Sequence, residues 1–337
     1  MLDSPGKETV VGFAQVLGQE RAVSLLRRAI ETSRLPHALL FTGPRGVGRY
    51  LTALTTVKAM NCVGGVKGDC CNRCLSCSKI AKGVHPDVHL FAPQGASLKI
   101  DQIRGLAQEA TLKPYEGRLK VFILDQAETM TEQAQNALLK TLEEPPGATL
   151  LILIAPQASS LLPTIASRCT QIRFAPLPER LIAARLWEDG CDEEEAHFLA
   201  SLAGGSLGRA QELRRSPLRE IKELVEQAFA LPPGRTLPLL ELTERLVRQK
   251  ETLSLFLEAL LAWCRDLMVS KVTHQEALLV YRSRRATLRR QSERLAPAEL
   301  LAMYQTVKQT MDGLRRYANP RLSLEAMFLK LRELQAA

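Results

Sequence analysis

The segment HALLFTGPRGVGRY, residues 37–50, constrains the fold more than any other part of the chain. Its apolar first half predicts a buried strand, its glycines predict a tight turn, and a helix is expected from Arg49 to Met60. A strand, a Gly-rich loop and a helix in this order form phosphate loops, in which backbone N–H groups wrap an anion at the helix N-terminus. The glycines of this loop are Gly43, Gly46 and Gly48.

The two chemically active positions of such a loop are changed. Arg49 replaces the lysine and lacks the compact ammonium that reaches the β- and γ-phosphates, and Tyr50 replaces the hydroxyl residue that binds Mg²⁺. Asp125 ends a second apolar run, as a magnesium-holding carboxylate does, but Gln126 follows it, and an amide cannot act as a general base. The sequence predicts a chain that does not hydrolyse ATP. It favours a structural role for the loop over retained nucleotide binding, which stays the alternative.

Further strands are expected where apolar runs recur, at residues 120–124 and 149–155. The helix expected between them, over residues 132–142, would begin at a capping box formed by Thr129 and Glu132. Strands that alternate with helices form parallel sheets covered on both faces. The first part of the chain is therefore predicted to be an α/β domain.

The strand signals disappear after residue 178, and amphipathic helices follow. We expect three parts in a chain of this length: an α/β domain over residues 1–178, a small helical domain over 179–215 and a helical domain over 216–337. The predicted fold class is α/β plus all-α.

A cluster of cysteines lies just after the helix of the phosphate loop. The spacing x8, x2, x2 offers four thiolates for one tetrahedral metal ion with no open position, and we favour a structural Zn²⁺ held by Cys62, Cys71, Cys74 and Cys77. Cys70 is adjacent to one of them and is not expected to be a ligand. The alternatives are an iron–sulfur cluster, a site in which His85 or His89 replaces a cysteine, and reduced thiols without metal.

Charge and hydropathy set broader limits. The net charge of +9 permits an anionic partner such as DNA without requiring one. Six arginines crowd the segment 282–294, where a solvated helix face is favoured over DNA contacts. No apolar run reaches the ~18 residues of a membrane span, and the first residues lack the features of a secretion signal. We expect a soluble cytoplasmic protein with no membrane partner.

Taken in order, the motifs resemble one family, the AAA+ clamp-loader subunits of bacterial DNA polymerase III. The resemblance is carried by the segments GQE (18–20), HALLFTGPR (37–45), the inserted cysteines, HPD (85–87), AETM (127–130), NALLKTLEEPP (136–146) and SRC (167–169), with a weaker match at NPRLSLE (319–325). It implies an AAA+ module, made of a parallel sheet with flanking helices and a small helical lid, followed by a helical collar domain.

Within that family the γ/τ subunits hydrolyse ATP and the δ′ branch typically does not. The altered residues place this chain on the δ′ side, because a sensor arginine of the lid is also displaced: Gly208 stands at its position and Arg209 follows one residue late. Ser167-Arg168-Cys169 is intact, and the resemblance implies that Arg168 is an arginine finger that points into a neighbouring subunit's ATP site.

The resemblance also implies partners and a role. These are γ/τ and δ subunits in a hetero-pentameric ring, the sliding clamp, and primed DNA reached through the assembly. The chain would be a non-hydrolysing stator that helps load the clamp during DNA replication. The alternatives are a γ/τ-like ATPase and a stand-alone zinc-containing DNA-binding protein.

Overall fold

The computed structural model describes residues 12–230, 237–273 and 275–336. Its contacts divide the chain into two compact units. The first contains the described residues up to 181 together with 205–208, and the second contains 182–204 and the described residues from 209 onward. The division into three parts at residues 178 and 215 stays a prediction.

The first unit is built on a five-stranded parallel sheet with the strand order β2-β3-β4-β1-β5. The three central strands are buried along their whole length. The strands are β1 (Ala38–Thr42), β2 (Val88–Phe91), β3 (Lys120–Leu124), β4 (Thr149–Ala155) and β5 (Thr170–Arg173). The strands expected at 120–124 and 149–155 are confirmed with these bounds.

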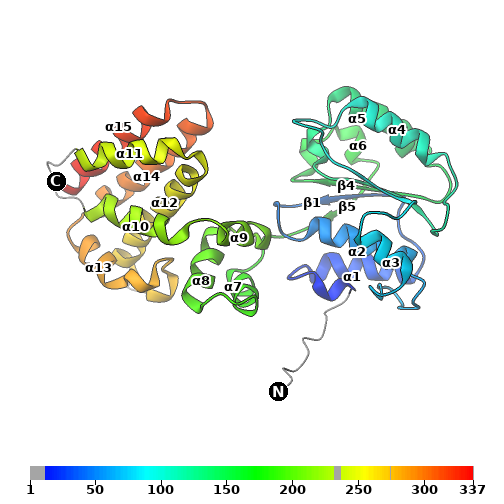
Figure 1. Cartoon of the computed structure of the whole chain (residues 1–337), viewed down its shortest axis with the longest axis horizontal. Helices are drawn as coiled ribbons and strands as arrows, with labels where there is room; N and C mark the ends of the chain where they lie inside the picture. The colour runs from blue at the N-terminus through cyan, green and yellow to red at the C-terminus, as the bar shows by residue number, and fades with distance from the viewer. Residues whose placement is uncertain (1–11, 231–236, 274, 337) are drawn as a thin grey trace, which may run out of the picture. The chain divides into compact units, whose positions relative to one another are not determined.

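Helices cover both faces of the sheet (Figure 1). One face packs with the 3₁₀ helix η1 (Gly12–Gln15) and with α1 (Glu20–Glu31), α2 (Arg49–Asn61) and α3 (Leu75–Ala81). The other face packs with α4 (Ile100–Ala110), α5 (Glu132–Glu143) and α6 (Pro163–Ala166). Because side chains alternate along a strand, Leu39 and Phe41 join the first core, and Ala38 and Leu40 join the second. Both cores are apolar, as the continuous apolar strands require.

The start of α5 differs from the expectation. The N-cap is Thr131, whose hydroxyl accepts the backbone N–H of Ala134 at 3.2 Å. Thr129 instead ends the 3₁₀ helix η2 (Ala127–Thr129) and donates its hydroxyl to the carbonyl of Gln126 at 2.8 Å. The predicted capping box is therefore wrong by two residues, because the chain first completes a short turn after β3.

Helices make up the rest of the described chain. Besides the short η3 (Ala158–Ser160), η4 (Glu276–Leu278) and η5 (Arg282–Arg284), they are α7 (Glu179–Glu188), α8 (Glu193–Leu202), α9 (Leu207–Arg214), α10 (Leu218–Ala230), α11 (Leu237–Arg248), α12 (Lys250–Val272), α13 (Arg285–Glu293), α14 (Pro297–Arg315) and α15 (Pro320–Ala336). The α/β plus all-α fold class is confirmed.

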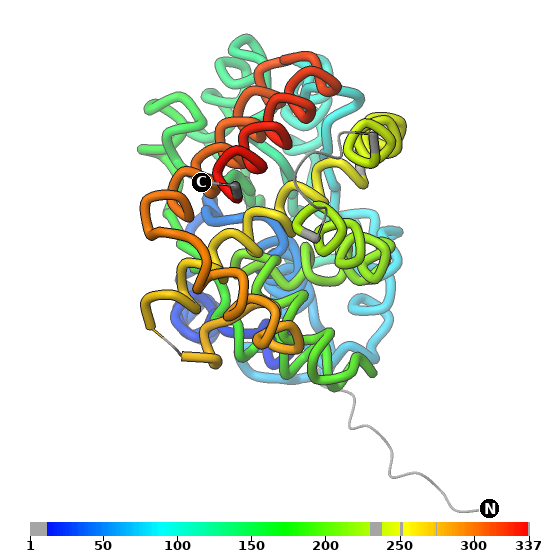
Figure 2. Tube along the Cα trace, turned by 90° about the vertical axis from the view of Figure 1, so that its left-hand side faces the viewer, coloured from blue at the N-terminus to red at the C-terminus, as the bar shows by residue number. Residues whose placement is uncertain are grey.

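The second unit packs around α12, which contacts α10, α11, α13 and α14, while α15 lies along α14 (Figure 2). Trp263 of α12 is fully buried, and its ring centroid lies 4.9 Å from that of Tyr281. Asp266, one turn further on, is buried and accepts the backbone N–H groups of Val280 and Tyr281, both at 2.8 Å. This carboxylate fixes the loop that follows α12. None of the described helices is long and apolar enough to cross a membrane.

Candidate functional site

The loop between β1 and α2 keeps a backbone shape that only glycine permits. Gly43 and Gly48 have positive φ angles of 145° and 101°. A Cβ atom at residue 43 would lie 2.3 Å from the carbonyl oxygen of Phe174, so no larger residue fits there. The Gly43 N–H donates to the carbonyl of Pro156 at 3.0 Å. At least this amide of the loop is therefore committed to the protein itself.

Arg49, at the position of the phosphate-binding lysine, is turned to the end of the sheet. Only 8% of the residue is exposed, and its Nη1 donates to the carbonyl of Ala155, the last residue of β4. Burial lowers the pKa of Arg49, and the negative charges of Glu128 and Asp125 oppose that shift. The carboxylates of its own chain thus partly offset the cost of burying this guanidinium.

The other altered positions lie at the same edge of the sheet. Tyr50 is partly exposed, and burial together with the charge of Asp125 raises the pKa of its phenol, which therefore stays protonated. Asp125 follows β3, and its carboxylate accepts the backbone N–H of Gln126 at 3.0 Å. Among the residues predicted for a nucleotide site, Asp125 is the one that carries a carboxylate. The amide of Gln126 cannot act as a general base.

The first turn of α9 closes over the glycine loop. The N–H of Gly208 donates to the carbonyl of Gly46 at 2.9 Å, and a Cβ atom built at residue 208 would lie 2.9 Å from the Gly46 Cα. The backbones of the two segments are therefore in direct contact, which only glycine at residue 208 allows. Arg209, next in the chain, forms an ion pair with Glu258 of α12. The charge of Arg209 is therefore paired with a carboxylate of the second unit.

Arg168 is placed differently from Arg49. It lies between α6 and β5 with 36% of its side chain exposed. Its Nη1 donates to the carbonyl of Thr164 at 2.9 Å, and its Nη2 lies 2.6 Å from the Oε1 atom of Glu143, the last residue of α5. The contact with Thr164 is a hydrogen bond and that with Glu143 is an ion pair, so most of the five guanidinium N–H donors have no hydrogen-bond acceptor within the described chain.

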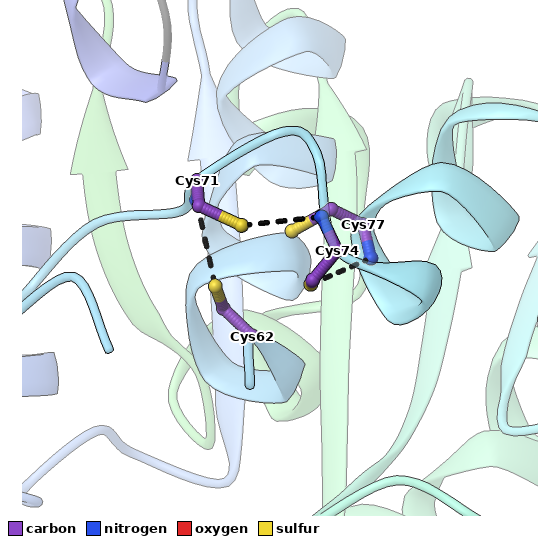
Figure 3. A group of neighbouring side chains, drawn as sticks. All are labelled: Cys62, Cys71, Cys74 and Cys77. Carbon is purple, nitrogen blue, oxygen red and sulfur yellow. Dashed lines mark hydrogen bonds between the residues drawn. The ribbon is translucent and has the colours of Figure 1, made fainter. Parts of the chain in front are cut away.

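The four cysteines predicted to bind metal come together beside α2 and α3 (Figure 3). Their sulfur atoms all lie within 4.8 Å of one another, and no other residue of the described chain joins the group. Cys62 caps the C-terminus of α2, and Cys74 caps the N-terminus of α3. A tetrahedral site with metal–sulfur bonds of about 2.3 Å has sulfur–sulfur edges of about 3.8 Å. The donor set therefore fits one tetrahedral ion with no open position.

Backbone N–H groups donate to three of the four clustered sulfurs. The N–H groups of Cys71, Cys74 and Cys77 each donate to the preceding sulfur of the cluster, at 3.4, 3.3 and 3.5 Å. Burial opposes ionisation of Cys74, but N–H donors from Cys77 and Val63 bring the pKa of that thiol down to about 6. These donors favour the thiolate of Cys74, the form that binds metal, whereas burial raises the pKa of Cys77.

Cys70 and the two histidines stand outside the cluster. The Cys70 thiol is buried 3.5 Å from the Asn72 Oδ1, and burial, with the charge of Asp69, raises its pKa to about 11. His85 accepts the backbone N–H of Asp87 on its Nδ1 at 3.2 Å, and the ring of His89 stacks on a phenylalanine. The grouping of ligands gives no support to a site in which a histidine replaces a cysteine.

Asp69 joins the cysteine insert to the N-terminal part of the unit. Its carboxylate accepts the backbone N–H of Phe13 at 3.0 and 3.3 Å and forms an ion pair with Arg27 of α1. A Cβ atom at residue 12 would lie 2.0 Å from the Asp69 Oδ1, so Gly12 is required for this approach. The charge of Asp69 therefore anchors the insert to η1 and α1, whereas the cysteines join it to the end of α2.

Sequence reasoning missed Asp87, which the structure places at the start of β2. It is fully buried and accepts three successive N–H groups, those of Tyr115, Glu116 and Gly117, at 2.6, 2.8 and 2.7 Å. Burial alone would raise the pKa of Asp87, but these three donors lower it overall. The available signal was an acid set directly before the segment VHLF, which is interrupted by a histidine and so is not a continuous apolar run.

Three of the six arginines in the segment 282–294 form ion pairs within their own unit. Arg284 pairs with Glu226 at 2.5 Å, Arg285 with Glu276 at 3.2 Å and Arg289 with Glu293 at 3.2 Å. Exposed and paired arginines of this kind are typical of a solvated helix face. These contacts agree with the interpretation favoured from the sequence.

Comparison with known proteins identifies the family to which the chain is similar. Residues 18–178 match the family described as DNA polymerase III, delta subunit. The chain is 34% identical over 272 residues to DNA polymerase III subunit delta′ of Bacillus subtilis, covering 77% of this chain and 80% of that protein. It is 31% identical over 309 residues to the subunit delta′ of Pseudomonas aeruginosa, covering 87% of this chain and 91% of that protein.

Similarity also extends to other subunits. DNA polymerase III subunit tau/gamma of Haemophilus influenzae is 33% identical over 223 residues, which are 65% of this chain but only 31% of that longer protein. Among solved structures, a gamma subunit-related protein of Thermotoga maritima has a TM-score of 0.44 at 22% identity, covering 93% of this chain and 99% of that one. The two delta′ relatives are matched over most of their length, and the chain belongs to the family of bacterial DNA polymerase III delta′ subunits.

Proposed function

We propose that this chain is a non-hydrolysing subunit of the bacterial clamp loader, a stator that supplies Arg168 as an arginine finger to a neighbouring subunit's ATP. Its partners are γ/τ and δ subunits in a hetero-pentameric ring, which loads the sliding clamp on primed DNA in the cytoplasm. The observation that carries the proposal is the contrast between two arginines. Arg49 is buried against its own sheet, whereas Arg168 presents its guanidinium at the surface.

The altered loop explains why the chain would serve a neighbour's site and not its own. Arg49 is engaged by the Ala155 carbonyl, and Gly208 packs on Gly46. A nucleotide would have to displace both contacts before any phosphate reached the loop amides. Even then, Gln126 supplies no base, and the phenol of Tyr50 cannot replace a magnesium-binding hydroxyl.

The first prediction concerns the isolated protein. We expect no ATP turnover above background and no measurable binding of a fluorescent ATP analogue, because the loop is engaged internally and lacks a base. ADP release with Mg²⁺ and ATP measures the first quantity, and fluorescence anisotropy measures the second. The double variant Arg49→Lys, Tyr50→Thr should stay inactive, since residue 126 remains glutamine. Turnover of ~1 s⁻¹, the lower end of typical kinase rates, would instead favour a γ/τ-like ATPase.

The second prediction tests the arginine finger in a reconstituted complex with γ/τ and δ. Removal of such a finger costs on the order of 10³- to 10⁵-fold in rate at the site it serves. Arg168→Ala should therefore abolish the part of the DNA-stimulated ATPase activity that comes from the ATP site served by Arg168. Clamp loading should fall with it, and assembly of the complex should be unchanged. Arg168→Lys should rescue little, because lysine lacks the planar fork. Full ATPase and loading in a complex that contains Arg168→Ala would refute the proposal.

A stand-alone DNA-binding role makes a different prediction. It requires that the isolated protein bind DNA with an affinity that falls steeply as salt is raised. The proposed stator should show this behaviour only within the assembled complex. Anisotropy titrations of labelled primed DNA at several salt concentrations separate the two roles.

We also propose that the cysteine site holds a structural Zn²⁺. Four thiolates in a closed tetrahedral arrangement are typical of structural zinc and leave no position for a substrate. The ion would stabilise an insert with few apolar residues of its own.

A further inference from the structure

The end of α5 carries an acidic residue where a helix disfavours one. Glu143 is the last residue of α5, and the C-terminus of a helix bears a partial negative charge that repels a carboxylate. Its side chain is 48% exposed, so it does not contribute to a core. Its contact is with Arg168, at 2.6 Å from the Nη2 atom. The placement of Glu143 is therefore accounted for by that arginine and not by the stability of α5.

We infer that Glu143 is a positioning residue for Arg168, an inference that rests on the proposed function. The guanidinium is held at two atoms: Nη2 contacts Glu143, and Nη1 donates to the Thr164 carbonyl at 2.9 Å. These two contacts restrict the rotation of the guanidinium. The N–H donors that remain are then oriented before any partner arrives.

Holding Arg168 in place reduces the conformational entropy that its side chain loses when it meets a ligand. A free arginine side chain samples many rotamers, and ordering it at the moment of catalysis slows the reaction. An exposed ion pair of this kind contributes little to folding, so its removal should leave the fold intact. The positioning role therefore predicts a kinetic defect without a stability defect.

Glu143 acts through Arg168, so its removal should affect only complexes that retain the arginine. In the reconstituted complex, Glu143→Ala should lower the kcat of DNA-stimulated ATP hydrolysis at the served site about three- to tenfold. The KM for ATP and the melting temperature should stay unchanged. Glu143→Gln keeps an acceptor for the guanidinium and should retain most of the activity. Glu144, the next residue and also exposed, gives the matched control, because Glu144→Ala should match the wild type.

The double variant Glu143→Ala, Arg168→Ala gives the sharpest test. If Glu143 only positions the arginine, the double variant should have the same kcat as Arg168→Ala alone. An additional loss in the double variant, a kcat raised by Glu143→Ala, or an equal loss in Glu144→Ala would each overturn the inference. If Arg168→Ala lowers activity and Glu143→Ala does not, the inference fails and the proposed function stands. If Arg168→Ala has no effect, both fail.

Discussion

Replacement of Cys74 by serine is expected to release the metal ion and to cause the largest loss of stability of any single change in the first unit. Structural Zn²⁺ supplies on the order of 10–16 kcal/mol of apparent binding free energy in small domains. Three of the four ligand cysteines are buried in the core that also contains residues of α1 and α2. The free energy of unfolding should therefore fall by more than about 4 kcal/mol. Elemental analysis of the purified protein and thermal unfolding measure the two effects.

Cys70→Ser is the matched control for this change. Its thiol is buried next to the cluster but stands outside the ligand group, so the variant should keep one equivalent of metal. Equal metal loss in Cys70→Ser and Cys74→Ser would rule out the assigned ligand set. Iron and labile sulfide in the wild-type protein would favour the iron–sulfur alternative, and no metal at all would favour reduced thiols.

The second large effect is expected for Asp87→Asn. The carboxylate is fully buried and accepts three backbone N–H groups from residues 115–117. An asparagine of the same shape loses the charge and turns an NH₂ group toward those donors. The free energy of unfolding should fall by roughly 3–5 kcal/mol, measured by urea denaturation at neutral pH. Asp101→Asn, on a side chain that is 85% exposed, should change it by less than about 0.5 kcal/mol.

The lowered pKa of Asp87 also predicts how the stability of the protein changes at acid pH. The pKa of Asp87 is lowered in the folded protein, so its contribution to stability is present above the unfolded pKa, about 3.9, and is lost as the pH falls further. The difference in stability between the wild type and Asp87→Asn should therefore be constant from neutral pH down to about 5 and shrink below about 4. A difference that stays constant down to pH 2 would show that the charge of Asp87 is not responsible.

The strands could be predicted from the sequence only where they are buried on both faces. β3 and β4 lie inside the sheet, and every residue is buried, so each is a continuous apolar run. β2 and β5 are the two edges of the sheet and are partly exposed, with sequences VHLF and TQIR that carry no such signal. Edge strands are identified by their neighbours, which a local pattern does not contain.

The candidate site, too, could be predicted from the sequence only in part. The spacing of the cysteines was sufficient to select four of the five that lie close together, because metal ligands are set by local geometry. The contact of Arg49 with Ala155 and that of Arg168 with Glu143 join residues far apart in the sequence. The sequence analysis singled out Arg49 as a change in a phosphate loop and Arg168 as an arginine finger, but the opposite exposure of the two side chains could be known only from the folded chain.

The contact between Gly208 and Gly46 has a consequence for how such a chain can change over generations. Lysine and threonine at residues 49 and 50 would leave the hydrogen bond from Gly208 to Gly46 in place. An arginine at residue 208 would place its Cβ 2.9 Å from the Gly46 Cα, so the two backbone segments would have to move apart. A single substitution at any one of these positions is therefore not expected to create a nucleotide site. The contact between Gly208 and Gly46 would make such a change depend on several substitutions made together.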